Sequence, residues 1–158
     1  MGVNMAKLDE LDLKILQELV TDSSQSIPKL SKKIDVNTSV VYSRIKRLVR
    51  RGIIKRFTVE VDESQLGYTV SAYVGVNTDS KKRESVRAGI MGIPEVRELA
   101  EVTGRFDFLV FLRAKGLEEL HNVISQKIGM IDGVEHTETF ISMRQESKNP
   151  DIRIQVNS

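Results

Sequence analysis

The sequence contains no cysteine, and this absence excludes several kinds of protein. Without cysteine there is no disulfide framework, no thiolate nucleophile and no cysteine-based metal site. The apolar runs are far shorter than the ~18 residues that a membrane-spanning helix needs. Residues 1–10 also lack the basic-then-apolar order of a signal peptide. We therefore expect a cytoplasmic protein without a membrane partner.

Features of enzymes are scarce as well. The two histidines, His121 and His136, have neither the spacing of metal ligands nor a neighbouring nucleophile. The segment Gly89-Ile90-Met91-Gly92 does not continue as a phosphate-binding loop. We therefore expect no catalytic residues, no metal and no cofactor.

What the sequence does contain is the composition of a folded protein, with an uneven distribution of charge. Its 158 residues are 40% hydrophobic and 29% charged, which suits one domain or two small ones. The formal net charge is +2, but residues 1–60 carry 12 Lys or Arg against 7 Asp or Glu, and residues 61–158 carry 12 against 15. Between Lys29 and Arg56, ten basic residues accompany one acid, Asp35. Such a stretch is either a solvated helix face or a surface for nucleic acid.

Residues 1–60 have the pattern of a small helical domain. Apolar residues recur at helical spacing behind Asp9, which is a favourable helix-capping residue. A short helix at 27–34, a turn at Asp35-Val36 and a third helix capped by Asn37 together predict a helix-turn-helix. Residues 53–61 then alternate like a strand and predict the start of a wing. A protein-interaction module is the alternative, against which the basic stretch and the wing both argue.

In a helix-turn-helix the second helix lies in the major groove, with its N-terminal residues near base edges. Short hydroxyl and amide side chains can hydrogen-bond bases there, whereas Arg and Lys suit phosphates or guanine edges. We expect the groove to be contacted by Asn37, Thr38, Ser39, Tyr42, Ser43 and Lys46. We expect phosphate or flanking contacts from Ser31, Lys32, Lys33, Arg47, Arg50, Arg51 and Lys55. Hydrophobic packing is an equal alternative for Tyr42, and Arg44 is expected to form a salt bridge to the start of the first helix.

A polar linker at 61–67 separates this domain from a pattern of strand, helix, strand, strand, helix, strand. The expected elements span residues 68–77, 80–91, 96–103, 106–114, 117–131 and 134–143, in ferredoxin-like βαββαβ order. The strand 106–114 has Phe106 and Phe108 on one face and Leu109 and Phe111 on the other. Because helices of this fold cover one face of the sheet, we expect a partner subunit to cover the second face. Packing of the N-terminal domain there is the alternative.

Several segments together resemble the Lrp/AsnC family of transcription regulators. Residues 36–48 (VNTSVVYSRIKRL), followed by Gly52-Ile53-Ile54, resemble its recognition helix and the turn after it, and residues 8–16 (LDELDLKIL) resemble its opening helix. Residues 103–107 (TGRFD) match the family's Gly-x-x-Asp turn, and residues 137–141 (TETFI) match its last strand. Asp35 departs from the glycine frequent in the family, but aspartate tolerates left-handed backbone better than most residues.

The resemblance covers about residues 8–143 and implies an α+β chain. It implies a winged helix-turn-helix DNA-binding domain at 1–60, the linker at 61–67 and a ferredoxin-like amino-acid-sensing and oligomerisation domain at 68–158. It further implies a sequence-specific regulator of amino-acid metabolism genes that binds double-stranded DNA. Dimers would form through the C-terminal sheets and assemble into tetramers or octamers, with a free amino acid bound between dimers.

The turn at 103–107 has chemistry that suits an amino acid. Gly104 lets a ligand approach the backbone, whose N–H groups can meet a carboxylate, and Asp107 is placed to meet an ammonium group. A simple hairpin turn with an aspartate cap is the structural alternative. The other candidate effector-binding residues are Tyr73, Glu101, Thr103, Arg105, Thr137, Thr139 and Phe140. Their polar and charged character favours a polar or charged effector, such as glutamine or lysine.

Two further functions fit parts of this pattern. A metabolite sensor or enzyme-regulatory subunit would use the N-terminal domain for protein contacts instead of DNA. An architectural chromatin-like protein would bind DNA without responding to any amino acid.

Overall fold

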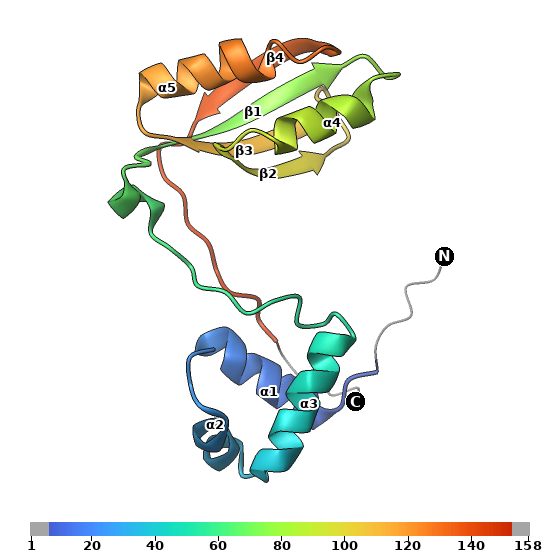
Figure 1. Cartoon of the computed structure of the whole chain (residues 1–158), viewed down its shortest axis with the longest axis vertical. Coiled ribbons are helices and arrows are strands. Elements are labelled where there is room, and N and C mark those ends of the chain that lie inside the picture. Colours follow the sequence, from blue (N-terminus) through green and yellow to red (C-terminus); the bar gives the residue numbers. More distant parts are fainter. Residues whose placement is uncertain (1–6, 153–158) are drawn as a thin grey trace. The chain divides into compact units, whose positions relative to one another are not determined.

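The structure, a computed structural model, describes residues 7–152 (Figure 1). Two compact units divide this part of the chain. One contains the described residues up to Glu60 together with those from Glu146 on, and the other spans Val61–Gln145. The second domain was expected to extend to residue 158, but the described residues after Gln145, 146–152, belong to the first unit, where Ile152 packs against the core. No helix within residues 7–152 is long and apolar enough to cross a membrane.

The first unit contains three helices: α1 (Glu10–Thr21), α2 (Ile27–Ile34) and α3 (Thr38–Arg50). Asp9 caps α1 by accepting a 2.9 Å hydrogen bond from the Asp12 backbone N–H, and Asp12 returns the interaction in a capping box. Ser26 caps α2, which has a proline in its first turn, where the missing N–H costs nothing. The expected positions of all three helices are therefore confirmed.

A small apolar core holds these helices together. Its buried members are Ile15, Leu16, Leu30, Val41 and Leu48. Full burial of one such side chain stabilises the fold by about 1.5–3 kcal/mol. With few fully buried residues, contacts from partly buried neighbours, including Ile152, matter to the stability of this unit.

The strand expected at residues 53–61 is absent from the described chain, so that prediction is wrong for the single subunit. A strand forms only against a partner, and the first unit contains, among residues 7–60 and 146–152, no second strand to supply the hydrogen bonds. The alternation noted in the sequence instead leaves Phe57, Val59 and Val61 exposed.

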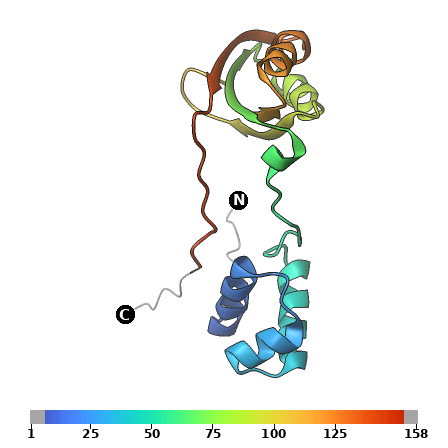
Figure 2. The ribbon, with the colours of Figure 1, turned by 90° about the vertical axis from the view of Figure 1, so that its left-hand side faces the viewer.

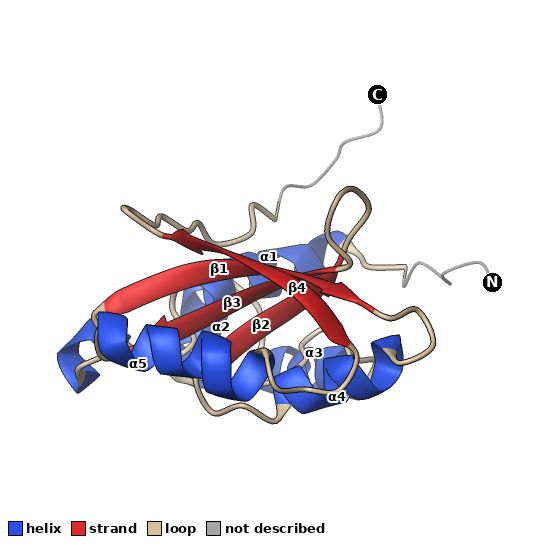
Figure 3. Cartoon of the chain, turned by 90° about the horizontal axis from the view of Figure 1, so that it is seen from above, coloured by secondary structure: helices blue, strands red, loops and turns tan. Residues whose placement is uncertain are grey.

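The second unit is a four-stranded antiparallel sheet with helices on one face (Figures 2 and 3). The spatial order of its strands is β2-β3-β1-β4, which is the ferredoxin-like order predicted from the sequence. Its elements, in chain order, are a 3₁₀ turn at Glu63–Leu66, β1 (Val70–Thr78), α4 (Arg83–Met91), β2 (Val96–Glu101), β3 (Phe108–Ala114), α5 (Leu117–Asn122) continuing as π-helix Val123–Ile128, and β4 (Val134–Ile141).

The two faces of this sheet differ in how they are covered. Between helices and sheet lies the core, which includes Val74, Val110, Val86 and Ile128. The other face, which we call the open face, carries several aromatic rings. The Tyr73 and Phe111 ring centroids are 5.0 Å apart, and those of Phe106 and Phe140 are 6.3 Å apart.

Phe106 lies on the open face, although the sequence placed it with Phe108 on the covered one. The reason is that β3 begins only at Phe108, so the turn before it decides where Phe106 points. Its ring lies over Gly75, where a Cβ atom would come within 2.6 Å of the ring. Gly75 is therefore the residue that makes room for this aromatic ring.

Candidate nucleic-acid interface and effector-binding turn

The turn between α2 and α3 adopts the geometry that a helix-turn-helix requires. Asp35 has left-handed backbone angles (φ 54°, ψ 52°), the only positive φ at a non-glycine position within residues 7–152. Aspartate adopts this conformation at smaller cost than most residues, so the family's glycine is not needed. Asn37 then caps α3, because its Oδ1 accepts hydrogen bonds from the Ser39 backbone N–H (2.9 Å) and the Ser39 hydroxyl (2.8 Å).

Ser31 lies inside this turn and not on a surface that could meet a phosphate. Its side chain is 8% exposed, and its hydroxyl donates to the Val36 carbonyl oxygen. It also accepts a 3.3 Å hydrogen bond from the Thr38 hydroxyl. A buried hydroxyl with internal partners stabilises the turn. The predicted contact of Ser31 with DNA therefore does not fit its buried position.

A buried carboxylate fixes α3 against α1. Asp12 is fully buried, and its oxygens accept from Arg44 Nη1 at 3.2 Å and from Arg47 Nη2 at 2.6 Å. Arg44 also pairs with Asp9 and, chiefly through that hydrogen bond, holds the pKa of the Asp9 carboxyl below its usual range. The salt bridge expected for Arg44 is confirmed. The sequence assigned Arg47 to phosphates, but its guanidinium is tied to Asp12.

The exposed face of α3 presents the remaining candidates. Exposed side chains there belong to Thr38, Ser39, Tyr42, Ser43, Lys46 and Arg50. The Lys46 ammonium lies 5.0 Å from the centroid of the Tyr42 ring, and Tyr42 is 49% exposed. This cation–π contact orders two side chains at the surface of the helix. Tyr42 thus lies on the outer face beside Lys46.

Other basic residues surround this face. Lys32, Lys33, Arg51 and Lys55 are exposed, and Lys33 pairs with Glu18 of α1. The charge excess seen in the sequence between residues 29 and 56 therefore lies within α2, α3 and the segment after them. The Lys33 side chain is 52% exposed in this pair, so its ammonium is accessible to a phosphate.

The turn expected to bind an effector lies between β2 and β3. Gly104 has φ 117°, and a Cβ placed there would meet no atom within 4 Å. Asp107 already has several partners: Oδ2 accepts from the Thr78 backbone N–H at 2.8 Å, and Oδ1 pairs with Arg83 Nη2 at 2.6 Å. Arg83 also reaches Glu101 at 3.3 Å. The carboxylate therefore holds the turn on β1 and α4 and is not free for an ammonium group.

The sheet separates the other effector candidates. Tyr73 and Phe140 are cross-strand neighbours on the open face, where Arg105 also pairs with Glu138. Thr137 and Thr139 are registered opposite Val76 and Val74, so they face the helix side of the sheet. Glu101, Thr103, Gly104 and Arg105 are exposed around the turn. The nine predicted residues are thus not gathered into one pocket of the single chain.

Two further contacts have no signal in the sequence. Arg83, which pairs with both Asp107 and Glu101, lies in an ordinary charged run as the first residue of α4. Ile152 follows a polar stretch without periodicity, yet it packs on the first unit's core. Both contacts join residues far apart in the chain, where spacing carries no signal.

Comparison with known proteins identifies both halves. The model of the winged helix-turn-helix DNA-binding family matches residues 8–55, and that of the Lrp/AsnC ligand binding domain matches residues 71–152. The transcriptional regulator FL11 of Pyrococcus furiosus is 33% identical over 147 residues, which is 93% of this chain and 97% of that protein. The regulator AzlB of Bacillus subtilis is 35% identical over 150 residues, covering 93% and 96% of the two chains.

Solved structures agree in fold. Escherichia coli AsnC has a TM-score of 0.87 and 26% identity, covering 94% of this chain and all of that one. A transcriptional regulator of Neisseria meningitidis, solved as an L-Met complex, has a TM-score of 0.88, 20% identity and coverage of 94% and 98%. A helix-turn-helix followed by a ferredoxin-like ligand-binding domain, with these relatives, places the chain in a family of regulators and not of enzymes. The chain belongs to the Lrp/AsnC family of transcriptional regulators.

Proposed function

We propose that this regulator recognises a specific sequence in double-stranded DNA through the exposed face of α3. The observation that carries the proposal is the division of α3 into two faces. Val41 and Leu48 are buried, Arg44 and Arg47 are tied to α1, and short polar side chains occupy the exposed first turns. Such side chains match the hydrogen-bonding groups in the major groove.

Within this proposal the residues have different tasks. Thr38, Ser39, Tyr42, Ser43 and Lys46 contact base edges, and Asn37 positions α3 by capping it. Lys32, Lys33, Arg50, Arg51 and Lys55 contact phosphates, which fix the register on the duplex. Arg47 contributes mainly through its bond to Asp12. The protein acts in the cytoplasm, where the DNA of the relatives' bacterial and archaeal cells lies.

The open face of the sheet is the surface through which two copies of the chain associate in this proposal. Tyr73 is 40% exposed and Phe140 is 43% exposed, and the rings of Phe106 and Phe111 lie beside them. A patch of aromatic rings left in water favours burial against a second copy. We propose a homodimer formed across this face, assembling further into tetramers or octamers.

We propose a free amino acid as the effector, bound at the turn between β2 and β3 and at the interface between dimers. The L-Met complex of the Neisseria meningitidis regulator supports this class of ligand. Charged groups at the turn, namely Glu101, Arg105 and Glu138, favour a polar or charged amino acid such as glutamine or lysine. Asp107 does not contact the effector in this proposal; it stabilises the turn through its bonds to Thr78 and Arg83. The genes controlled are those of amino-acid metabolism.

Fluorescence anisotropy with the protein's own upstream DNA tests the first proposal. The log of the association constant should fall by about 0.9 for each phosphate contact per tenfold rise in salt. Ser39→Ala and Lys46→Ala should each weaken binding to the preferred duplex about 5–100-fold more than to a random duplex. The matched control is Lys81→Ala, which removes an exposed lysine from the second unit. Equal affinity of the wild type for every duplex would refute sequence-specific recognition.

Calorimetry with the twenty amino acids tests the effector. Gly104→Val should abolish binding of whichever amino acid is found, since a side chain there blocks approach to the backbone. Gly67→Val is the control for backbone strain, because Gly67 also has a positive φ (92°) and open space around it. If Gly104→Val binds the amino acid as the wild type does, the effector lies elsewhere.

A further inference from the structure

The chain leaves the first unit at Glu60 and returns to it after β4. Asn149 Nδ2 donates a 3.3 Å hydrogen bond to the Val20 carbonyl oxygen at the end of α1. The Ile152 backbone N–H donates to Gln17 Oε1 at 3.2 Å, and the Ile152 side chain packs against the core. Residues 149–152, which we call the C-terminal strap, thus contact α1 through both backbone and side chain.

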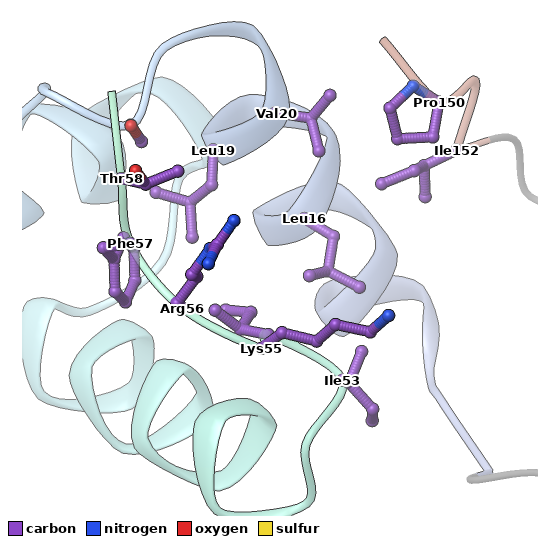
Figure 4. A pocket seen from close by; sticks show the side chains of 12 residues that line it. Leu16, Leu19, Val20, Ile53, Lys55, Arg56, Phe57, Thr58, Pro150 and Ile152 are labelled. Atoms are coloured by element: carbon purple, nitrogen blue, oxygen red, sulfur yellow. The ribbon is translucent and has the colours of Figure 1, made fainter. Parts of the chain in front are cut away.

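The strap forms one wall of an apolar groove (Figure 4). In Figure 4, Val20 of α1 lies on the side of Pro150 and Ile152, while Lys55 and Phe57 come from the segment after α3. The groove has a volume of about 420 Å³. Apolar side chains of α1 would face water here if the strap were not docked. A domain of this size buries little apolar surface on folding, so its stability depends on such contacts.

The strap packs against α1, and α1 is also the helix to which α3 is bonded. Asp12 lies on α1 one turn before Leu16, and its carboxylate bonds Arg44 and Arg47 of α3. A contact that orders the C-terminal half of α1 therefore stabilises the helix to which α3 is fastened. The contacts of the strap with α1 and those of α1 with α3 all lie within the first unit.

We propose that this chain's own C-terminal strap docks on α1, where it forms one wall of the groove, and that this docking is required for full DNA affinity. The inference rests on the proposed DNA binding for its effect on affinity, but docking itself can be measured without DNA. The strap is joined to β4 of the ligand-binding unit by residues 142–148. It therefore gives the first unit a second covalent connection to that unit, besides the linker at 61–67.

Hydrogen exchange of the full-length chain, read by mass spectrometry, tests the docking. Ile152→Asp places a charge against the apolar groove, and we expect exchange in the C-terminal half of α1 to become about tenfold faster. DNA affinity should fall by a similar factor. Met143→Asp is the matched control, because Met143 precedes the strap and is 96% exposed, so neither quantity should change.

Two further measurements keep the test decisive. Ile152→Ala removes apolar contact without adding a charge and should accelerate α1 exchange about threefold, even if Ile152→Asp does not fold. Unchanged exchange in α1 for Ile152→Ala would overturn the proposal. Faster exchange with unchanged DNA affinity would overturn the link to DNA. If the wild type binds no DNA, the proposed function fails, whereas docking still stands or falls on the exchange rates.

Discussion

Replacing Asp12 by alanine should loosen α3 more than any change at an exposed acid of the same helix. The carboxylate is fully buried and accepts hydrogen bonds from Arg44, Arg47 and the Asp9 backbone N–H. Removing one partner of a buried ion pair typically costs about 3–5 kcal/mol. The Arg44 and Arg47 side chains are 24% and 35% exposed, so water can partly replace the lost carboxylate. We therefore expect a cost near the lower limit, about 3 kcal/mol.

Hydrogen exchange in α3 measures this cost directly. A loss of about 3 kcal/mol should accelerate exchange of its protected amides about 100-fold. Asp12→Asn keeps one acceptor oxygen and should lie between alanine and the wild type. Glu10→Ala is the control, because its 2.9 Å pair with Lys14 is exposed and is expected to contribute at most about 0.5 kcal/mol. Exchange in Asp12→Ala within about threefold of the wild type would refute the role given to this carboxylate.

Three other outcomes follow from the structure. Arg44 lowers the pKa of Asp9, so this pair stabilises the fold fully above the unfolded carboxyl pKa of about 4. The stabilisation is lost as the pH falls through the lower pKa of the folded state. The free energy of unfolding in urea should therefore depend less on acid pH in Asp9→Asn. Gly75→Ala forces a Cβ atom against the Phe106 ring and should lower stability by about 1–3 kcal/mol, measured as a lower melting temperature. Phe140→Asp places a charge on the open face and should shift sedimentation toward the monomer; an unchanged oligomer would place the interface elsewhere.

Local features of the fold could be predicted from the sequence because short-range chemistry determines them. Asp9 and Asn37 cap their helices as expected, since a capping side chain bonds a backbone N–H two or three residues away. Apolar periodicity likewise identified every strand of the sheet and the order βαββαβ. The left-handed backbone of Asp35 agrees with the family resemblance, in which glycine is frequent at this turn.

Long-range contacts could not be predicted in the same way. The prediction of a wing strand was wrong because residues 53–61 need a partner strand that the described part of the single chain does not supply. The pairing of Arg44 with the start of α1 was expected, but Arg47, which has the same charge and lies on the same helix, was assigned to phosphates although it too bonds Asp12. Asp107 looked free for a ligand, yet Arg83, 24 residues earlier, occupies it.

Selection of bound sequences from a pool of random DNA duplexes tests the central claim most directly. The full-length chain should enrich a defined motif, because Ser39 and Lys46 on the exposed face of α3 contact particular base edges. The double variant of these two residues, selected under the same salt, should enrich a motif with one or more base pairs per half-site relaxed. An identical motif from the wild type and the double variant would contradict recognition through α3.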